Sequence, residues 1–169
     1  MVPTGFGRDG TATARHGGVV SITGAIPGEA VRVRALAHRR GVTHARIVEV
    51  LDPSPDRVVP PCAEIANGCG ACPWQHLDLA AQRTAKVDRV AAALGVEVDE
   101  LEPLVPLAAM GFRTTIQAAV DRGRAGFRRY RSHRVVPVAG RLVAHPLLVD
   151  LVTEARDRKS TRLNSSHVA

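Results

Sequence analysis

The chain has 169 residues, a formal net charge of +7 and a pI near 10.6, and apolar residues make up 45% of it. This composition is typical of a globular protein and excludes bulk disorder. No run approaches the roughly 20 apolar residues of a membrane span, and residues 1–9 hold no apolar stretch that could act as a signal peptide. We therefore expect a cytoplasmic protein, a monomer that does not bind membranes.

Arginine carries almost all of the positive charge. Lys and Arg together number 23 against 16 acidic residues, and only Lys86 and Lys159 are lysines. The arginine side chain binds phosphate groups with two hydrogen bonds and stacks on bases, so this pattern favours nucleic acid as a partner. A GC-rich genome, which encodes arginine in place of lysine, would give the same composition. The charge alone leaves both interpretations open.

Three short runs in the first third of the chain have the pattern of β-strands. They are residues 18–23, 30–36 and 43–50. In the second run valines alternate with Arg32 and Arg34, so one face of this strand is apolar and the other is basic. Residues 1–17 show no periodicity, and the proline-rich residues 52–61 read as a linker. Short strands spaced by turns predict a small barrel of the OB type.

Beyond the linker the pattern mixes helix and strand. The spacing of apolar residues predicts a helix over residues 78–94, with Gly95 placed to end it. A hairpin is predicted from runs at 113–120 and 125–130 around a turn, followed by a strand over 135–138 and a helix from about 145 to 156. Residues 157–169 are abruptly polar and continue no earlier pattern, so we expect a non-native tail.

All three cysteines lie in one segment. Cys62, Cys69 and Cys72 follow the pattern C-x6-C-x2-C. Three cysteines in a cytoplasmic chain argue against disulfides. Their spacing is typical of an iron–sulfur or zinc site, whose thiolate ligands come from one loop. We expect Gly68 and Gly70 to let the loop curl and to point amide groups at the sulfurs. The alternative is three thiols without a metal, and the residues do not decide which metal is bound.

Several of these segments, in this order, resemble one family. ARHGGVVSITGAIPGEAVRVR (residues 14–34) and EVLDPSPDRV (49–58) are similar to a TRAM domain, an OB-like barrel that binds RNA. PPCAEIANGCGACPWQHLDLAAQ resembles the cluster segment of the RNA uracil-5-methyltransferases, which use S-adenosylmethionine on ribosomal or transfer RNA. GFRTTIQAAVDRGRAGFRRYRSHRVVPV (111–138) resembles their central domain. The resemblance covers roughly residues 5–150.

The resemblance implies a domain organisation. We expect a β-rich OB-like (TRAM) barrel over residues 1–58, then a small and incomplete α+β central domain over 59–156, with the non-native tail after it. The family's barrel has a strand before the position of Gly5, so the first strand is expected to be missing and an edge exposed. The family's C-terminal Rossmann-like methyltransferase domain is expected to be absent, because the chain contains no strand–GxGxxG–helix unit.

The resemblance also implies a metal site. Cys62, Cys69 and Cys72 would be three of the four ligands of a 4Fe–4S cluster. The family's fourth cysteine falls at or beside Arg141, so the fourth ligand is absent here. A labile cluster completed by water is one alternative. Zinc is the other, completed by one of three histidines: His76, His133 or His145.

The family's catalytic parts are expected to lie outside this chain. Its members attack carbon 6 of the uracil with a cysteine thiolate, and that cysteine and the S-adenosylmethionine site belong to the absent domain. We therefore expect an RNA-binding N-terminal fragment of such an enzyme, inactive alone. The alternatives are a freestanding TRAM-type RNA-binding module with a structural metal site and, third, an iron–sulfur electron carrier.

Two basic strips are the candidate RNA contacts. The barrel strip comprises Arg32, Arg34, Arg39 and Arg40. The hairpin strip comprises Arg122, Arg124, Arg128, Arg129, Arg131 and Arg134. Phe127, Tyr130 and His133 are interleaved with the second strip. Cations hold phosphates, and aromatic rings stack unpaired bases at about 1–3 kcal/mol each. The alternative is a solvated edge on which Phe127 and Tyr130 face the core.

Overall fold

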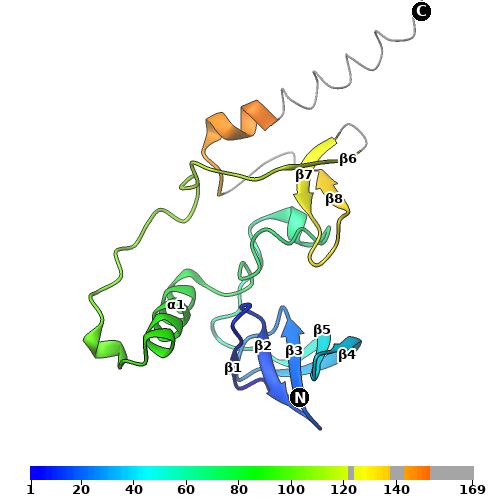
Figure 1. Cartoon of the computed structure of the whole chain (residues 1–169), viewed down its shortest axis with the longest axis vertical. Coiled ribbons are helices and arrows are strands. Elements are labelled where there is room, and N and C mark those ends of the chain that lie inside the picture. Colours follow the sequence, from blue (N-terminus) through cyan, green and yellow to red (C-terminus); the bar gives the residue numbers. More distant parts are fainter. Residues whose placement is uncertain (122–123, 138–142, 153–169) are drawn as a thin grey trace, which may run out of the picture. The chain divides into compact units, whose positions relative to one another are not determined.

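The computed structural model describes residues 1–121, 124–137 and 143–152 (Figure 1). The chain divides into two compact units. Unit 1 comprises Met1–Pro60 and Pro73–Leu104, and unit 2 comprises Pro61–Cys72 and Val105–Ala169. The segment Pro73–Leu104, expected to lie beyond the barrel domain, belongs with the barrel to unit 1.

Unit 1 contains a five-stranded sheet with the order β1-β2-β3-β5-β4. The strands are β1 (Gly5–Phe6), β2 (Ala12–Arg15), β3 (Val19–Thr23), β4 (Ala30–Arg39) and β5 (Val42–Asp52). Neighbouring strands are antiparallel, except that β3 and β5 are parallel. The three predicted runs are confirmed as β3, β4 and β5. The first two strands were missed, because small alanine and threonine residues give little hydrophobic alternation.

The segment before β1 closes this sheet into a ring. Met1 and Val31 of β4 exchange both backbone hydrogen bonds, at 2.7 and 2.9 Å. On the other side, the amide of Thr4 donates to the carbonyl of Thr13 in β2 at 2.8 Å. The expected exposed edge is therefore wrong at this point, since the segment pairs with β4 and β2 at once. That this chain lacks the first strand of the family's barrel stays a prediction.

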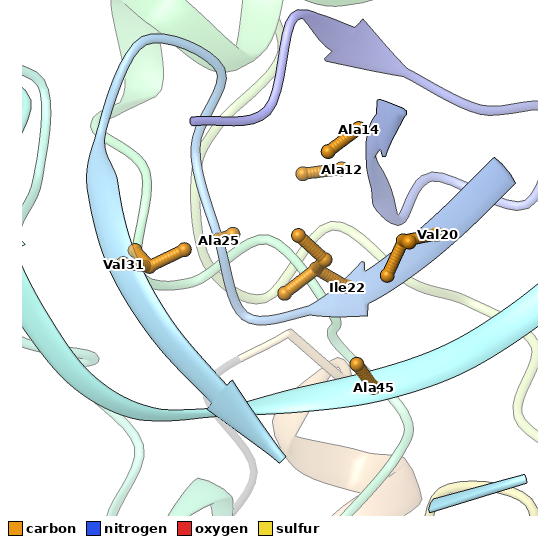
Figure 2. Close-up of a cluster of buried hydrophobic side chains, with 7 residues drawn as sticks. All are labelled: Ala12, Ala14, Val20, Ile22, Ala25, Val31 and Ala45. Carbon is orange, nitrogen blue, oxygen red and sulfur yellow. The ribbon is translucent and has the colours of Figure 1, made fainter. Parts of the chain in front are cut away.

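Small aliphatic side chains fill the inside of the barrel. They form one buried cluster, Ala12, Ala14, Val20, Ile22, Ala25, Val31 and Ala45. In Figure 2 these side chains point toward one another from the surrounding strands. The register pairs Ala12 with Ile22 and Ala14 with Val20, so alternate residues of β2 and β3 share the inner face. The outside of the barrel carries charged side chains and also exposed apolar ones, among them Leu36, Val48 and Leu51.

Helix α1 (Leu79–Leu94) forms where the sequence predicted it. Asp78 caps its first turn with a side-chain hydrogen bond of 2.7 Å, and Gly95 ends it in a left-handed conformation with φ of 73°. Arg89 on this helix donates to the carbonyl of Gly7 at 2.7 Å. The helix is thereby fastened to the N-terminal segment of the barrel. A short 3-10 turn, η2 (Val98–Glu100), follows it.

Trp74 fastens the segment before α1 to the same part of the barrel. Its indole Nε1 donates to the carbonyl of Gly10 at 2.6 Å, and its ring centroid lies 4.8 Å from that of Phe6. The guanidinium carbon of Arg89 lies 5.9 Å from the centre of the indole ring. These contacts hold Pro73–Leu104 in unit 1.

Unit 2 contains a three-stranded antiparallel sheet with the order β6-β7-β8. Its strands are β6 (Ala119–Asp121), β7 (Arg124–Arg128) and β8 (Val135–Pro137). The predicted hairpin and following strand are confirmed, although the hairpin's first strand is shorter than expected. Residues 146–152 are helical, as predicted, and the tail at 157–169 lies outside the described residues. Among the residues that the structure describes, no helix has the length and apolar character that a membrane span needs.

Candidate nucleic-acid interface and cysteine loop

The cysteine loop, residues 62–72, curls back on itself as the sequence predicted. Cys62 precedes a 3-10 turn, η1 (Ala63–Ile65). The amide of Gly68 donates to the carbonyl of Ile65 at 2.9 Å, and the amide of Cys69 donates to that of Glu64 at 2.9 Å. Gly68 adopts a positive φ of 86°, a conformation that favours glycine. The loop is therefore shaped by its own backbone hydrogen bonds.

Glycine also lets this loop pair with the end of β7. Cys69 and Arg129 form an antiparallel bridge, and the amide of Gly70 donates to the carbonyl of Arg128 at 3.1 Å. A Cβ at Gly70 would lie 2.8 Å from the backbone nitrogen of Tyr130, so only glycine allows this approach. The expectation that the amide of Gly70 points at a cysteine sulfur is therefore wrong. Its partner is a backbone carbonyl.

The three cysteines lie in one loop, as a shared metal site requires. All three side chains are partly buried, and thiolates are the right donors for zinc or an iron–sulfur cluster. In the part of the chain that the structure describes, however, no group of three or more His, Cys, Asp or Glu side chains is placed to hold a metal ion. Arg141, at the position of the family's fourth cysteine, lies outside the described residues. Metal binding by Cys62, Cys69 and Cys72 therefore stays a prediction.

The histidines expected to complete a zinc site have other surroundings. His76 lies in unit 1, with its Nε2 3.4 Å from a backbone carbonyl of the barrel. Burial, together with the charge of Arg57, lowers the pKa of His76 from its ordinary value. In unit 2, Nδ1 of His133 lies 3.4 Å from a guanidinium nitrogen of Arg128, and His145 is exposed. None of them is gathered with the cysteines into a ligand group of described residues.

A buried ion pair that the sequence analysis missed joins the linker to the barrel. Glu29 is 1% exposed, and its carboxylate accepts hydrogen bonds from the guanidinium of Arg57, with one Nη2–Oε2 distance of 2.6 Å. The amides of Ile26 and Ser54 also donate to it, at 3.0 and 3.2 Å. Burial alone would raise the pKa of Glu29, but the hydrogen bonds from Arg57, Ile26 and Ser54 together lower it. This pair stabilises unit 1 and is not part of an RNA-facing surface.

The arginines of the barrel strip differ in their surroundings. All four of its arginines are exposed, as an RNA contact requires. Arg32 is paired with Glu49 across β4 and β5, so its charge is already balanced. Arg34 instead lies directly opposite Arg46, a residue that the sequence analysis did not select. Arg39 is the last residue of β4, and Arg40 occupies the turn that leads into β5.

The hairpin strip is gathered at one end of the sheet in unit 2. Its described side chains, Arg128, Arg129, Arg131 and Arg134, are all exposed. They lie at the end of β7 and in the connection to β8, which closes with a hydrogen bond of 2.9 Å from the amide of Arg129 to the carbonyl of Arg134. Arg122 and the side chain of Arg124 lie outside the described residues.

The same connection carries an exposed aromatic ring. The guanidinium carbon of Arg131 lies 5.9 Å from the centre of the Tyr130 ring, and Tyr130 is 38% exposed. Phe127 is half-buried, so the two rings differ in environment. Arg129 lies against the cysteine loop, since a Cβ at Gly68 would come within 2.9 Å of its Nε. An exposed ring flanked by cations can stack a base and bind the phosphates beside it.

Comparison with known proteins identifies the relatives of this chain. No protein-family model matches it. It is 35% identical over 92% of its length to an uncharacterized RNA methyltransferase of Streptomyces avermitilis. It is 34% identical over 99% of its length to the 23S rRNA (uracil(1939)-C(5))-methyltransferase RlmD of Halomonas elongata. The chain covers 40% and 37% of these two proteins, so it spans about two fifths of the relatives it matches.

A solved structure shares the fold. The tRNA (uracil-54, C5)-methyltransferase of Pyrococcus abyssi, in complex with S-adenosyl-L-homocysteine, superposes with a TM-score of 0.63 at 20% identity. The match covers 92% of this chain and 35% of that one. Over nearly its whole length, the chain is therefore a homologue of the RNA uracil-5-methyltransferases.

Proposed function

We propose that the chain is the RNA-binding N-terminal part of an S-adenosylmethionine-dependent RNA uracil-5-methyltransferase that acts on ribosomal or transfer RNA. The observation that carries this proposal is the identity of about a third, over nearly the whole chain, to proteins named as RNA methyltransferases. In this proposal the protein works in the cytoplasm as a monomer. Its barrel over residues 1–58 is a TRAM domain, and residues 59–156 are the central domain.

The surface of unit 2 supports RNA as the ligand. The connection between β7 and β8 presents Arg128, Arg131 and Arg134 to solvent beside the exposed ring of Tyr130. Such a surface suits unpaired RNA, because the cations bind phosphates while the ring stacks on any base. Arg34, Arg39 and Arg40 of the barrel are also exposed to solvent, so each unit carries its own basic surface.

Methyl transfer is assigned to residues beyond those of this sequence. S-adenosylmethionine would supply the methyl group in a complete enzyme. All three cysteines of the chain lie in the cysteine loop, and Gly70 joins that loop to β7 by a backbone hydrogen bond. We therefore give this chain the tasks of binding and orienting RNA. A cluster or zinc ion on Cys62, Cys69 and Cys72 has no part in those tasks.

The test is RNA binding by the whole 169-residue chain at several salt concentrations. We expect affinity for a fluorescently labelled single-stranded RNA to fall steeply with salt, with a log–log slope of about −0.7 for each phosphate contacted. The variant R131Q/R134Q should bind more weakly with a smaller slope. K86Q, which removes an exposed cation from α1, is the control and should bind like the wild type.

Two further readouts can contradict the proposal. Binding without salt dependence would remove RNA phosphates as the ligand. Transfer of a labelled methyl group from S-adenosylmethionine to uracil by the purified chain would show that the nucleophile is present in this sequence. The relatives found are named as methyltransferases and not as freestanding binding modules, so that alternative is not favoured.

A further inference from the structure

The outer face of β4 and β5 holds two arginines where a sheet would ordinarily pair opposite charges. The two strands run antiparallel, side by side (Figure 1). Their register places Arg34 directly opposite Arg46. Both side chains are exposed. Residues directly opposite each other in an antiparallel pair share a face, with Cβ atoms about 4.5–5.5 Å apart, and like charges there are destabilising.

The neighbouring pair of charged residues on the same face has opposite charges, as is usual across a sheet. Arg32 lies opposite Glu49, and their side chains form an ion pair. The two ion pairs found among the described residues are this one and that of Arg57 with Glu29. Neither ion pair involves Arg34 or Arg46, and Glu49, the carboxylate in the adjacent row, is already paired with Arg32. The sheet therefore keeps two adjacent cations at a cost in stability, which an anion from outside would offset.

Further cations extend this face across the sheet. Val42 of β5 lies opposite Arg39 of β4 and Val19 of β3, and Val19 lies opposite Arg15 of β2. Val42 and Arg46 are four residues apart on β5 and share a face, so Arg15 and Arg39 lie on that face too. This row lies four residues along β5 from Arg46, or about 13 Å at 3.3 Å per residue. The cations are spread over a surface wider than one small anion could cover. Repeated negative charges on an extended chain match such a spacing.

We propose that Arg34 and Arg46 form a binding site for the phosphodiester backbone of RNA, extended by Arg39 and Arg15. This inference rests on the proposed function, because it takes RNA as the ligand. The row between the arginines holds one ring, the imidazole of His44, which lies opposite Ser21 and Ala37 and is partly buried. The arginines therefore supply the contact, which is made to the phosphates of the RNA backbone. Arg32, balanced by Glu49, is not part of the site.

The test compares R34Q and R46Q with R32Q/E49Q, which removes the neighbouring ion pair from the same face without changing the net charge. Binding of a labelled single-stranded RNA to the whole chain is measured at several salt concentrations. We expect R34Q and R46Q each to weaken binding several-fold and the double variant to reduce the slope by about 0.7 for each phosphate that it no longer binds. R32Q/E49Q should leave the slope unchanged.

Stability gives a second readout with the opposite sign. Removing one of two opposed cations relieves their repulsion, so R34Q or R46Q should raise the denaturant midpoint of unit 1 while weakening RNA binding. R32Q/E49Q removes an ion pair and should not raise it. A variant that is merely misfolded would lose both stability and binding, so the opposite signs identify the site.

The outcomes separate this inference from the proposed function. If the wild type binds RNA with a steep salt slope and R34Q/R46Q keeps that slope, the site is overturned while the proposed function stands. If the wild type shows no salt-dependent RNA binding, the proposed function fails first. Binding of the wild type to vesicles containing phosphatidylglycerol, abolished in R34Q/R46Q without any change in RNA binding, would assign the face to lipid phosphates and also overturn the site.

Discussion

Each of the two units is stabilised internally by a different kind of contact. In unit 1, seven buried side chains fill a closed ring of strands, and the ion pair of Glu29 with Arg57 fixes the linker. In unit 2 the buried apolar residues of the described part are few and small, namely Ala125, Val136 and Ala144. Its backbone segments approach so closely that a Cβ has no room at Gly70, where the cysteine loop meets Tyr130, or at Gly126, where β7 meets Val136 of β8. Unit 1 thus depends on side chains, and unit 2 on close backbone contacts.

The chain carries its own probe for each unit. It has one tryptophan and one tyrosine, and Trp74 lies in unit 1 while Tyr130 lies in unit 2. Tryptophan fluorescence during denaturant unfolding therefore reports on unit 1. Near-ultraviolet absorbance of tyrosine reports on unit 2. Each substitution below can be assigned to one unit by following both signals.

The largest effect is expected at the buried ion pair. Arg57→Ala leaves the carboxylate of Glu29 buried without its guanidinium partner, which ordinarily costs about 3–5 kcal/mol. The tryptophan-detected midpoint of unit 1 should fall accordingly. Arg32→Ala is the matched control, because it breaks an exposed arginine–glutamate pair that contributes about 0–1 kcal/mol. Equal losses in the two variants would mean that the buried pair is not a principal support of unit 1.

The backbone contacts of unit 2 are tested by adding one methyl group. A Cβ at Gly126 would lie 2.1 Å from the carbonyl oxygen of Val136, and at Gly70 it would meet the backbone of Tyr130. We expect Gly126→Ala and Gly70→Ala to destabilise unit 2 by about 1–3 kcal/mol each, seen in the tyrosine signal. Gly5→Ala is the control, since nothing lies within 4 Å of a Cβ there. If all three substitutions are tolerated alike, unit 2 is not held as described.

A smaller effect is expected from the indole of Trp74. Trp74→Phe keeps an aromatic ring beside Phe6 but removes the hydrogen bond to the carbonyl of Gly10. The expected loss in unit 1 is about 1 kcal/mol. Far-ultraviolet circular dichroism replaces fluorescence as the readout, because the substitution removes the only tryptophan. An unchanged midpoint would show that the ring contact alone fixes this segment.

The smallest effect is the response of unit 1 to acid. The pKa of Glu29 is lowered in the folded chain from its ordinary value of 4.5, so the ionised carboxylate favours folding. The contribution of Glu29 to the free energy of unfolding is complete above pH 4.5, the ordinary pKa, and is lost as the pH falls through the lowered pKa of the folded state. Denaturant midpoints measured from pH 6 downward should show that decline. In Glu29→Gln the part of the decline due to this group should be missing.

Local signals made part of the fold predictable. The bounds of α1 followed from a capping aspartate, Asp78, and from Gly95 at its end. Strands β3, β4 and β5 followed from runs of β-branched residues. The strand β2 escaped because Ala12 and Ala14 are small, although both are buried. Closure of the ring through Met1 depends on a partner 30 residues away, which no local pattern reveals.

The candidate site was predictable only in part for the same reason. Composition selected Arg34 and its neighbours, but the opposition of Arg34 and Arg46 depends on a register shift between Ala35 and Ala37. Without that irregularity a regular hairpin would pair Arg34 with the following residue, Ile47. The ion pair that removes Arg32 from the barrel strip depends on a second shift beside it. RNA binding by either strip, and a metal on the cysteines, stay predictions.

The ring closure of the barrel has a consequence for the order of events during synthesis. Met1 pairs with Val31, which is 30 residues away. The carbonyls of Gly7 and Gly10 accept hydrogen bonds from Arg89 and Trp74, which are 82 and 64 residues away. During synthesis these groups therefore stay without their partners until Trp74 and Arg89 have left the ribosome. Long-range closure of this kind slows folding. The residues that precede β2 are thus among the last of unit 1 to be fixed in place.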